Sequence, residues 1–499
     1  MKTVFMKYLL ATLLITSTSA HAAQPCADLS KFVSAEHQIV IRHASEESGA
    51  CRVDGVIDAR TGRDGKPYGI GFSIALPADW NGRFLFQGGG GLNGSVQPPL
   101  GAQYAGDRPA LVRGFAVAST DSGHQGAVFD GSFLRDQQAT VDFLYQGVAT
   151  VTVIAKQLVA QRYGKAPDHS YFVGCSTGGR EAMMMSQRFP TYFDGIVAAA
   201  PAMRTNFSNL GLRHATTALN SIAPAKPDGQ RDTRAALSDA DRKLVIDRVL
   251  ETCDVLDGNR DGFIFAPQDC RFDPGALTCK GGKKAGCLTR AQVSTLRTVM
   301  RGPRTPSGRQ VYPGYYYDTG IANTNGLSGI LAGPVIPEGR PVGVSMDVDA
   351  AAADAMDARA MAGDVNAWTN LSTFRGHGGK LIFLHGVSDP WFSSQDTVQY
   401  YERLAQDNAE APLEQWSRLF LVPGMGHCGG GARTLDHVDL LDALVDWVEH
   451  GRAPERVIAT GASAPGESRP LCPYPSHAQY TGTGDAHVAA NYSCRKPDR

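Results

Sequence analysis

Short apolar segments that end in glycine or another turn residue recur along the chain. Such nearly continuous apolar runs are typical of buried parallel strands, and we predict strands at residues 83–87, 115–119, 171–174, 196–200, 380–385 and 419–422. Apolar residues at three- and four-residue spacing predict helices at 141–164 and 180–189. This alternation of strands and helices indicates an α/β architecture with a mostly parallel sheet.

The segment 203–376 interrupts the alternation. It is rich in Asp, Gly, Pro and cysteine pairs, and it contains the aromatic cluster 312–320. A chain of 499 residues exceeds what one core usually holds, so we expect a core in two parts, 23–202 and 377–499, with 203–376 inserted between them as a lid domain. Within the lid, the Ala/Asp-rich residues 347–361 predict a surface helix.

Residues 1–22 have the pattern of a secretory signal peptide. Two lysines precede an apolar stretch at 8–15, and small residues ending in Ala-His-Ala follow at 20–22. The stretch is too short for a stable membrane anchor, although a buried N-terminal helix is the alternative interpretation. We expect cleavage after Ala22 or Ala23 and a secreted or periplasmic protein. No later stretch approaches the length of a membrane span, so no membrane anchor is expected.

Charge is nearly balanced along the chain. There are 48 Lys and Arg residues against 49 Asp and Glu residues, which gives a formal net charge of −1. This balance lacks the basic excess typical of nucleic-acid binding, so no nucleic-acid partner is expected. Charged residues make up 19 %, and the chain has 56 Gly and 28 Pro, a composition typical of a loop-rich globular enzyme. Oligomeric state is not indicated by any of these features.

The chain contains ten cysteines, and an exported chain places them in an oxidising compartment. No C-x-x-C pair occurs, which argues against a zinc ribbon or a thioredoxin-like redox site. Sequence alone does not fix disulfide connectivity. Pairing of nearest neighbours predicts Cys26–Cys51, Cys253–Cys270, Cys279–Cys287 and Cys472–Cys494, and it leaves Cys175 and Cys428 without a local partner.

Residues 174–178, Gly-Cys-Ser-Thr-Gly, fit the G-x-S-x-G pattern of a nucleophile elbow. In that motif glycines allow a strained turn from strand to helix, which exposes the serine hydroxyl above the edge of the sheet. Here the motif follows a predicted strand and begins a predicted helix, the arrangement that the motif requires. We therefore predict Ser176 as the nucleophile of an α/β-hydrolase fold that carries a large inserted lid domain.

The partners of Ser176 are expected in the chain order Ser, acid, His. Asp389 follows the strand at 380–385, and His427 follows the strand at 419–422, so both lie at the carboxyl edge of the sheet. His427 would accept the serine proton while Asp389 orients its ring. Asp121 and His124 precede the serine and are interpreted as structural. Other acids and histidines near these strand ends stay open as alternatives: Asp396, Asp436, His385 and His437.

The two cysteines without a local partner support the pairing of Ser176 with His427. Cys175 precedes Ser176 and Cys428 follows His427. A working Ser–His pair brings the two backbones close together, which places the cysteines within bridging distance. We predict a Cys175–Cys428 disulfide that holds the base next to the nucleophile; two unrelated buried thiols are the alternative.

The glycine-rich run 88–94 follows the first predicted strand. Its backbone N–H groups are accessible because no side chains intervene, so Gly90 or Gly91, together with the N–H of Thr177, would form an oxyanion hole. The choice between the two glycines stays open. The run lacks the Gly-Lys-Ser/Thr of a phosphate-binding loop, which argues against nucleotide binding.

Residues 257–264, Asp-Gly-Asn-Arg-Asp-Gly-Phe-Ile, match the first half of a calcium-binding loop. The twelfth position is Gln268 in place of glutamate, so this is not a complete EF-hand, and Asp254 could supply the missing carboxylate. A solvated acidic turn is the alternative. The predicted structural calcium would be bound by Asp254, Asp257, Asn259, Asp261 and Phe263.

Taken together, these motifs resemble those of the tannase and feruloyl esterase family, including its mono(2-hydroxyethyl) terephthalate hydrolase branch. The resemblance rests on Cys175-Ser176, Asp389, His427-Cys428, the segment 254–264 and the cysteines of the C-terminal tail. It implies two-step hydrolysis of aromatic esters through an acyl-enzyme, without an organic cofactor. It also implies a lid that closes over the aromatic ring and a calcium ion in that lid, held by three aspartate side chains and two backbone carbonyls.

Aromatic residues and arginines provide the candidates for substrate contacts. Trp391 and Phe392 follow the predicted acid and could flank an aromatic ring, as could the tyrosines of 312–317. A terephthalate monoester would need a cation for its free carboxylate, for which the candidates are Arg304, Arg309 and Arg340. We expect a small aromatic ester, with feruloyl or galloyl esters preferred over the terephthalate type. A catalytically silent binding protein on the same fold is the alternative of a different class.

Overall fold

A nine-stranded sheet forms the centre of the computed structural model, which describes residues 24–324, 326–336, 339 and 341–497. The strand order is β1-β2-β3-β5-β4-β6-β7-β8-β9. Strands β1 to β3 and the β3–β5 pair are antiparallel, whereas all pairs from β5 to β9 are parallel. The strand bounds are β1 (Ile39–Glu47), β2 (Ala50–Thr61), β3 (Pro67–Pro77), β4 (Arg83–Gln87), β5 (Ala116–Thr120), β6 (His169–Cys175), β7 (Gly195–Ala199), β8 (Lys380–Gly386) and β9 (Ser417–Val422).

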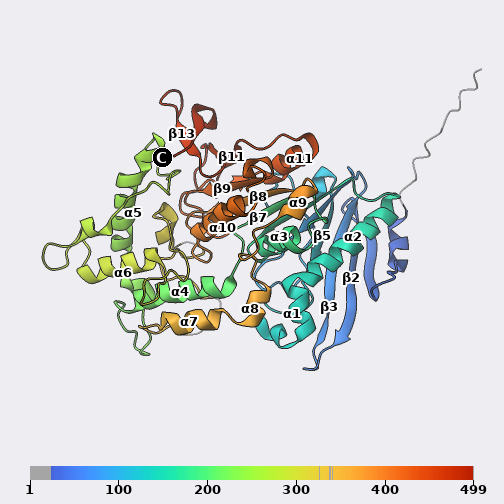
Figure 1. Cartoon of the computed structure of the whole chain (residues 1–499), viewed down its shortest axis with the longest axis horizontal. Coiled ribbons are helices and arrows are strands. Elements are labelled where there is room, and N and C mark those ends of the chain that lie inside the picture. Colours follow the sequence, from blue (N-terminus) through green and yellow to red (C-terminus); the bar gives the residue numbers. More distant parts are fainter. Residues whose placement is uncertain (1–23, 325, 337–338, 340, 498–499) are drawn as a thin grey trace, which may run out of the picture.

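All six predicted strands are present as the parallel strands β4 to β9. They read as continuous apolar runs because both faces of the sheet are covered. On one face, Phe84 and Phe86 of β4 pack in a core with α2 (Gly147–Tyr163), α3 (Thr177–Arg188) and α10 (Ser394–Asp407). On the other face, Leu85 packs in a second core with α11 (Leu440–His450). Figure 1 shows the sheet between these helices.

The helical run Gln137–Tyr163 corrects the prediction that no later stretch approaches a membrane span. By length and composition alone this run is apolar enough to cross a membrane, with a mean hydropathy of 1.3 over its best window. However, 61 % of that window is buried inside the protein, and α2 packs on β3 and β5. The high hydropathy is therefore that of a core helix. The predicted signal peptide lies outside the described residues.

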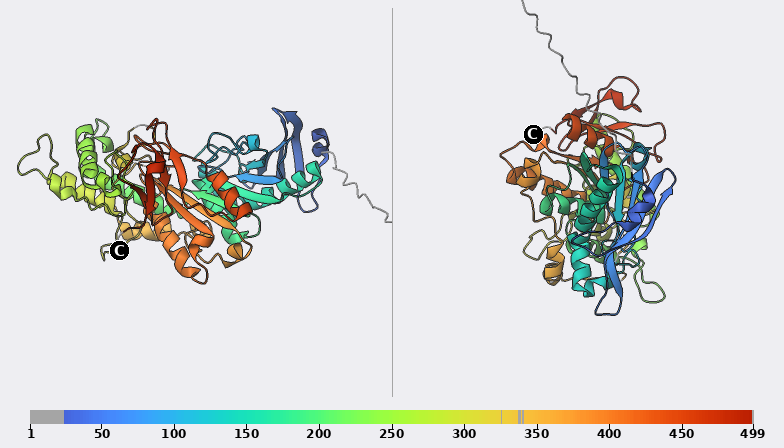
Figure 2. Two further views of the ribbon diagram at one scale, coloured as in Figure 1. Left: turned by 90° about the horizontal axis from the view of Figure 1, so that it is seen from above. Right: turned by 90° about the vertical axis from the view of Figure 1, so that its right-hand side faces the viewer.

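A large insertion separates β7 from β8. Its main helices are α4 (Thr205–Asn220), α5 (Asp239–Cys253), α6 (Arg290–Arg301), α7 (Val348–Ala355), α8 (Ala358–Ala362) and α9 (Ser372–Gly376). Figures 1 and 2 show α4, α5 and α6 on one side of the molecule, away from β1 to β3. Helices α5 and α6 begin at capping boxes formed by Ser238 and Thr289, and both contribute to a separate apolar core. The surface helix predicted at 347–361 is instead two short helices.

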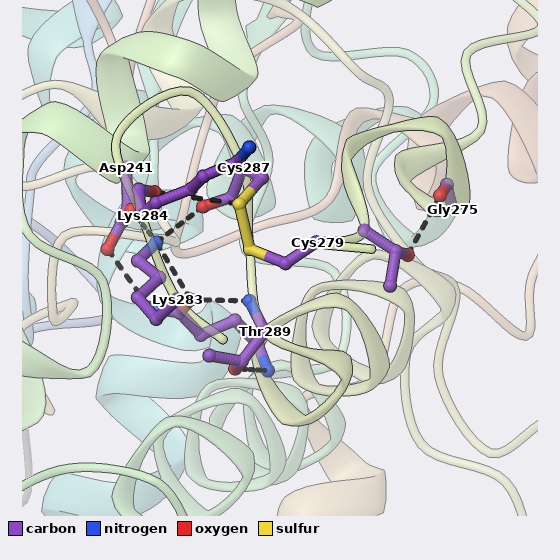
Figure 3. Close-up of a disulfide and its surroundings, with 9 residues drawn as sticks. Asp241, Gly275, Cys279, Lys283, Lys284, Cys287 and Thr289 are labelled. Atoms are coloured by element: carbon purple, nitrogen blue, oxygen red, sulfur yellow. Dashed lines mark hydrogen bonds and ion pairs between the residues drawn. A yellow bond between two sulfur atoms is a disulfide. The ribbon is translucent and has the colours of Figure 1, made fainter. Parts of the chain in front are cut away.

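All ten cysteines are paired in the structure: Cys26–Cys51, Cys175–Cys428, Cys253–Cys270, Cys279–Cys287 and Cys472–Cys494. Figure 3 shows the Cys279–Cys287 pair at the start of α6, beside Lys283. Lys283 forms an ion pair with Asp241 of α5 and donates to the carbonyl of Cys287 at 2.7 Å. Lys283 also donates to Oε1 of Gln292 in α6 at 3.2 Å, so the disulfide loop is fixed to two helices of the insertion.

The C-terminal region adds two small sheets beside the core. One contains β10 (His437–Val438), β11 (Val457–Thr460) and β12 (Arg469–Leu471), and the other contains β13 (His477–Tyr480) and β14 (Tyr492–Arg495). Cys472–Cys494 joins the end of the first sheet to the second.

Candidate active site

Ser176 lies at a sharp turn between β6 and α3. Its backbone has φ 64° and ψ −122°, a left-handed conformation that costs a non-glycine residue about 1–3 kcal/mol. Neighbouring chain segments hold it there: its N–H donates to the carbonyl of Ala199 at 3.1 Å, and its carbonyl accepts the N–H of Ala202 at 3.1 Å. Space around the turn requires glycine, because a Cβ at Gly174 would lie 2.5 Å from the carbonyl oxygen of Gly178. The local sequence therefore builds the elbow that its motif predicts.

Asp389 and His427 are hydrogen-bonded to each other. Nδ1 of His427 lies 2.7 Å from Oδ2 of Asp389, whose side chain is fully buried. The other oxygen of Asp389 accepts the N–H groups of Trp391 and Phe392 at 2.8 Å and 3.1 Å. Burial opposes the charged form, but the charges and hydrogen bonds of His427 and His385 hold the pKa of Asp389 well below its ordinary value. An ionised Asp389 on Nδ1 leaves Nε2 of His427 free to act as a base.

The disulfide Cys175–Cys428 brings Ser176 and His427 together from distant parts of the chain. Its Cα atoms are 5.9 Å apart and its cysteines are separated by 253 positions in sequence. Tyr104 supports the histidine loop by donating to the carbonyl of Cys428 at 3.1 Å. Within the described residues, Ser176 Oγ and His427 are not hydrogen-bonded, and Nε2 lies 3.6 Å from Cys428 Sγ. A catalytic Ser–His bond often tightens only when substrate is bound.

The alternative acids and histidines have other contacts. Asp396 forms an ion pair with Arg204, and Asp436 accepts the N–H of Gly430 at 2.7 Å. His437 is exposed and pairs with Asp107 at 3.0 Å. Asp396, Asp436 and His437 are not hydrogen-bonded to Asp389 or His427 in the described part of the chain, which leaves Asp389 and His427 as the candidate acid–base pair.

The fourth alternative, His385, lies next to the acid of the site. It is completely buried, and its Nε2 lies 3.3 Å from Oδ2 of Asp389 while Nδ1 is 2.8 Å from Thr397 Oγ1. His385 therefore contacts the carboxylate of Asp389 and helps to hold it in place. Asp121 and His124 have the structural roles expected of them: Asp121 accepts the N–H of Gly71 at 2.9 Å, and His124 stacks on Phe133 at 3.6 Å.

The glycine-rich loop lies beside Ser176. Gly91 and Thr177 line the same cavity as Ser176, and the Thr177 hydroxyl donates to the carbonyl of Gly91. Gly90 is exposed and is not among the lining residues. The N–H groups of Gly88 and Gly89 are already bonded, whereas those of Gly90 and Gly91 have no acceptor among the described residues. Of the two glycines, only Gly91 therefore combines an N–H without an acceptor among the described residues with a place in the lining of this cavity.

A cavity of about 830 Å³ opens next to Ser176. Trp391 and Phe392 line it, and their rings lie 4.9 Å and 5.1 Å from the ring of His427. Phe129, from the loop after β5, also lines the cavity and packs edge-on against Trp391 at 5.8 Å. These three rings form an aromatic wall beside Asp389 and His427; Trp391 and Phe392 were candidates from the sequence, whereas Phe129 was not.

Two arginines of the described residues, Arg180 and Arg204, line the cavity, and both are already bonded within the protein. Arg180 donates to the carbonyls of Leu144 and Phe143 at 2.7 Å and 3.0 Å. Both carbonyls lie in the π-helical turn η4 (Asp142–Gln146), where the backbone departs from the α-helical bonding pattern. Arg204 contacts both carboxylate oxygens of Asp396 through Nε at 3.1 Å. The other charged groups that line the cavity in the described part of the chain are carboxylates: Asp354, Asp357 and Asp364.

Other residues predicted to contact substrate lie elsewhere. Tyr312 and Tyr315 are buried behind the acid loop, where Tyr312 accepts the N–H of Ser393 at 3.1 Å and Tyr315 donates to the carbonyl of Pro390 at 3.3 Å. They position the loop and do not line the cavity. Arg304 donates to the carbonyl of Gly308 at 2.9 Å, away from the cavity. Arg309 is also absent from the cavity lining, and Arg340 lies outside the described residues.

The residues of the predicted calcium loop surround a buried carboxylate. One oxygen of Asp257 has no hydrogen-bond partner among the described groups. Burial, together with the nearby charges of Asp261 and Asp254, raises the pKa of Asp257 to about 8. Hard oxygen donors with an unpartnered buried carboxylate fit a divalent cation such as calcium. In the described structure, carboxylate oxygens of Asp254, Asp257 and Asp261 do not all lie within 4.8 Å of one another. Asp261 instead forms an ion pair with Arg469.

Comparison with known proteins agrees with this geometry. A family profile described as "Tannase and feruloyl esterase" matches residues 51–334 and 344–495. Mono(2-hydroxyethyl) terephthalate hydrolase from Piscinibacter sakaiensis is 38 % identical, over 90 % of this chain and 85 % of that protein. A probable feruloyl esterase B-2 from Aspergillus terreus is 33 % identical, over 82 % of this chain and 80 % of that protein.

Solved structures agree with the fold. The crystal structure of feruloyl esterase B from Aspergillus oryzae superposes with a TM-score of 0.75 at 27 % identity, and covers 94 % of this chain and 99 % of that one. The match extends over the core and the insertion alike. The chain therefore belongs to the tannase and feruloyl esterase family of carboxylic ester hydrolases, with an α/β-hydrolase fold.

Proposed function

We propose that this protein is an exported serine esterase that hydrolyses esters of neutral aromatic acids, such as feruloyl or galloyl esters. The relatives are named for feruloyl and terephthalate esters, both of which carry an aromatic acyl group. The wall formed by Phe129, Trp391 and Phe392 beside Ser176 suits such a ring. Five disulfides support export to an oxidising compartment, secreted or periplasmic.

In the proposed reaction, Ser176 Oγ attacks the ester carbonyl while Nε2 of His427 takes its proton. The N–H groups of Gly91 and Thr177 stabilise the negative charge that develops on the carbonyl oxygen. The intermediate collapses to an acyl-enzyme, and the imidazolium gives its proton to the departing alcohol. Water then attacks the acyl carbon with His427 as base, which releases the acid and restores Ser176. Asp389 orients the imidazole and stabilises its charged form throughout.

The observation that carries the substrate assignment is the charge of the cavity. Among the described residues that line the cavity, Arg180 is bonded to two carbonyls and Arg204 to Asp396, and the remaining charged groups are acidic. An anionic acyl group would therefore be buried without a cation, which is strongly unfavourable. A phenolic ring carries no such charge, and its hydroxyl groups can donate to Asp354 or Asp364.

Structural calcium is proposed for the loop 254–263 in the insertion. The chemistry of its donors and the unpartnered oxygen of Asp257 support this. Asp254, Asp257 and Asp261 would bind by side chain, and Asn259 and Phe263 by their carbonyls. When bound, the ion would neutralise crowded carboxylates and stiffen the insertion, which we propose acts as a lid over the cavity. No organic cofactor has a place in the proposed reaction.

The test compares esters that differ in acyl charge. Purified protein is assayed with methyl ferulate, methyl gallate and two terephthalate esters, the mono- and the bis(2-hydroxyethyl) forms. We expect kcat/KM for the neutral diester to exceed that for the charged monoester by about tenfold or more. A preference for the monoester would overturn the neutral-acyl assignment in favour of the terephthalate alternative. Turnover of none of these esters would support the silent binding protein.

A further inference from the structure

We propose that Glu181 is a positioning residue that fixes the oxyanion loop to the helix that carries the nucleophile. The inference rests on the proposed function, because it assigns a role within the same esterase site. Glu181 lies on α3, one turn beyond Ser176, and its side chain is 1 % exposed. The reaction as described above does not use it, and its position next to the elbow is not one that sequence pattern alone would single out.

The carboxylate of Glu181 accepts three hydrogen bonds. Oε2 accepts the backbone N–H of Gly89 at 2.9 Å. Oε1 accepts Asn93 Nδ2 at 2.6 Å and Ser122 Oγ at 3.0 Å. Asn93 and Ser122 are also bonded to each other. One side chain therefore contacts both ends of the short segment that contains Gly90 and Gly91.

The segment between these two contacts is a tight turn. The N–H of Asn93 donates to the carbonyl of Gly90 at 2.9 Å, and Asn93 has a positive φ of 53°. The backbone of α3 adds a further contact, since the N–H of Gly178 donates to the carbonyl of Gly89 at 3.0 Å. With Gly89 and Asn93 both fixed, the direction of the Gly91 N–H is set relative to Ser176 and Thr177, which begin the same helix.

The position requires a carboxylate and not merely a polar side chain. All three partners of Glu181 donate, and an ionised carboxylate only accepts. An amide at this position would direct its NH₂ group at another donor, either the N–H of Gly89 or Nδ2 of Asn93. Turning the Asn93 amide over would let Oδ1 accept that NH₂ group, but it would place Nδ2 at the buried position where Oδ1 has no partner. The Glu181→Gln change is almost identical in shape, so its main effect is this mismatch.

The test is the steady-state kinetics of Glu181→Gln with methyl ferulate. We expect kcat to fall by about 10²-fold, with KM within about twofold of wild type, because oxyanion donors act on the transition state and not on the bound ester. An aromatic boronic acid, which forms a tetrahedral adduct with Ser176, should lose affinity by a similar factor. The affinity for ferulate itself should stay unchanged.

A merely structural role is separated by two further variants. Ser186→Ala removes a buried hydroxyl on the same helix, bonded to the carbonyl of Met183 at 2.7 Å and remote from the loop, and it should keep kcat. The double change Glu181→Gln with Asn93→Asp restores matched donors and acceptors, since the new amide donates to the new carboxylate. It should recover at least about tenfold of the lost kcat.

The outcomes separate this inference from the proposed function. If wild-type protein hydrolyses no aromatic ester, the proposed function fails. If wild type is active and folded Glu181→Gln keeps its kcat, or loses it without recovery in the double variant, the positioning role fails. If Glu181→Gln does not fold, Ser122→Ala is measured instead, because it removes one of the three hydrogen-bond donors to Glu181. A lowered kcat with unchanged KM in this variant supports the positioning role. An unchanged kcat overturns it.

Discussion

At Ser176 the chain accepts an unfavourable backbone conformation to expose a hydroxyl group. The strain is held by hydrogen bonds to Ala199 and Ala202, and glycines at 174 and 178 leave room for the turn. Asp389 is held ionised in a fully buried position by two histidines and two backbone N–H groups. Each of these groups is fixed before substrate arrives, which lowers the reorganisation that the reaction would otherwise need.

Replacement of the nucleophile gives the most direct prediction at this scale. Ser176→Ala should lower kcat/KM for methyl ferulate by at least about 10⁴-fold, because no other group in the site can form the acyl-enzyme. Ferulate affinity, measured by calorimetry, should change by less than about twofold, since the aromatic wall is intact. Retained turnover in this variant would show that Ser176 is not the nucleophile.

Trp391 tests the aromatic wall. Trp391→Ala should raise KM for methyl ferulate and lower kcat/KM by about tenfold, because ring contacts of this kind contribute about 0.5–1.5 kcal/mol beyond the apolar area buried. A short acetate ester of p-nitrophenol, which has no aromatic acyl group, should lose less. Trp368→Ala is the matched control: Trp368 is 57 % exposed and does not line the cavity, so its kinetics should stay at wild type. Equal losses on both esters would argue against acyl-ring binding at Trp391.

At the scale of elements, the strands that could be predicted from the sequence are those buried on both faces of the sheet. Strands β4 to β9 could be predicted because both faces are covered and their sequences are continuous apolar runs. Strand β1 was missed because it alternates between exposed and half-buried positions and carries a bulge. Strands β2 and β3 are largely buried, but polar residues or glycines interrupt their apolar positions. The nucleophile elbow at 174–178 could be predicted from its glycines. The π-helical turn before α2, and Glu181 with its three donors, depend on contacts between residues far apart in sequence, which no local pattern encodes.

The acidic loop at 254–263 gives a prediction for pH and metal together. The pKa of Asp257 is raised to about 8 by burial and by Asp261 and Asp254, so the folded protein without calcium holds a proton there that the unfolded chain releases near pH 4. Because the folded pKa is the higher one, stability without calcium falls as pH rises from about 4 to about 8. Calcium binds the ionised carboxylate of Asp257, so the stabilisation that calcium provides should increase as the pH rises over this same range.

The measurement is the melting temperature with calcium and with a chelator, at pH 5.5 and at pH 8. We expect calcium to raise the melting temperature more at pH 8 than at pH 5.5, and Asp257→Asn to abolish most of that difference. Equal melting temperatures with and without calcium at pH 8 would show that the loop is a solvated acidic turn.

At the scale of the whole molecule, the active site joins two parts of the core that the insertion separates. Ser176 follows β6 and His427 follows β9, and the Cys175–Cys428 disulfide links them across the intervening chain. A bond that closes so long a loop restricts the unfolded chain strongly. Because the bonded cysteines are next to Ser176 and His427 in sequence, the bond also restricts how these two residues lie relative to each other.

Removal of this bond should therefore affect both stability and chemistry. The double variant Cys175→Ala with Cys428→Ala, which leaves no free thiol, should lose about 2–5 kcal/mol of unfolding free energy. Its kcat should also fall well below that of wild type, at a temperature where the variant is still fully folded by circular dichroism. Cys26→Ala with Cys51→Ala removes a disulfide at the N-terminal end of the core; it should lose stability but keep kcat. If both double variants keep kcat while losing stability, the Cys175–Cys428 bond only stabilises the fold, and Ser176 and His427 are positioned by packing alone.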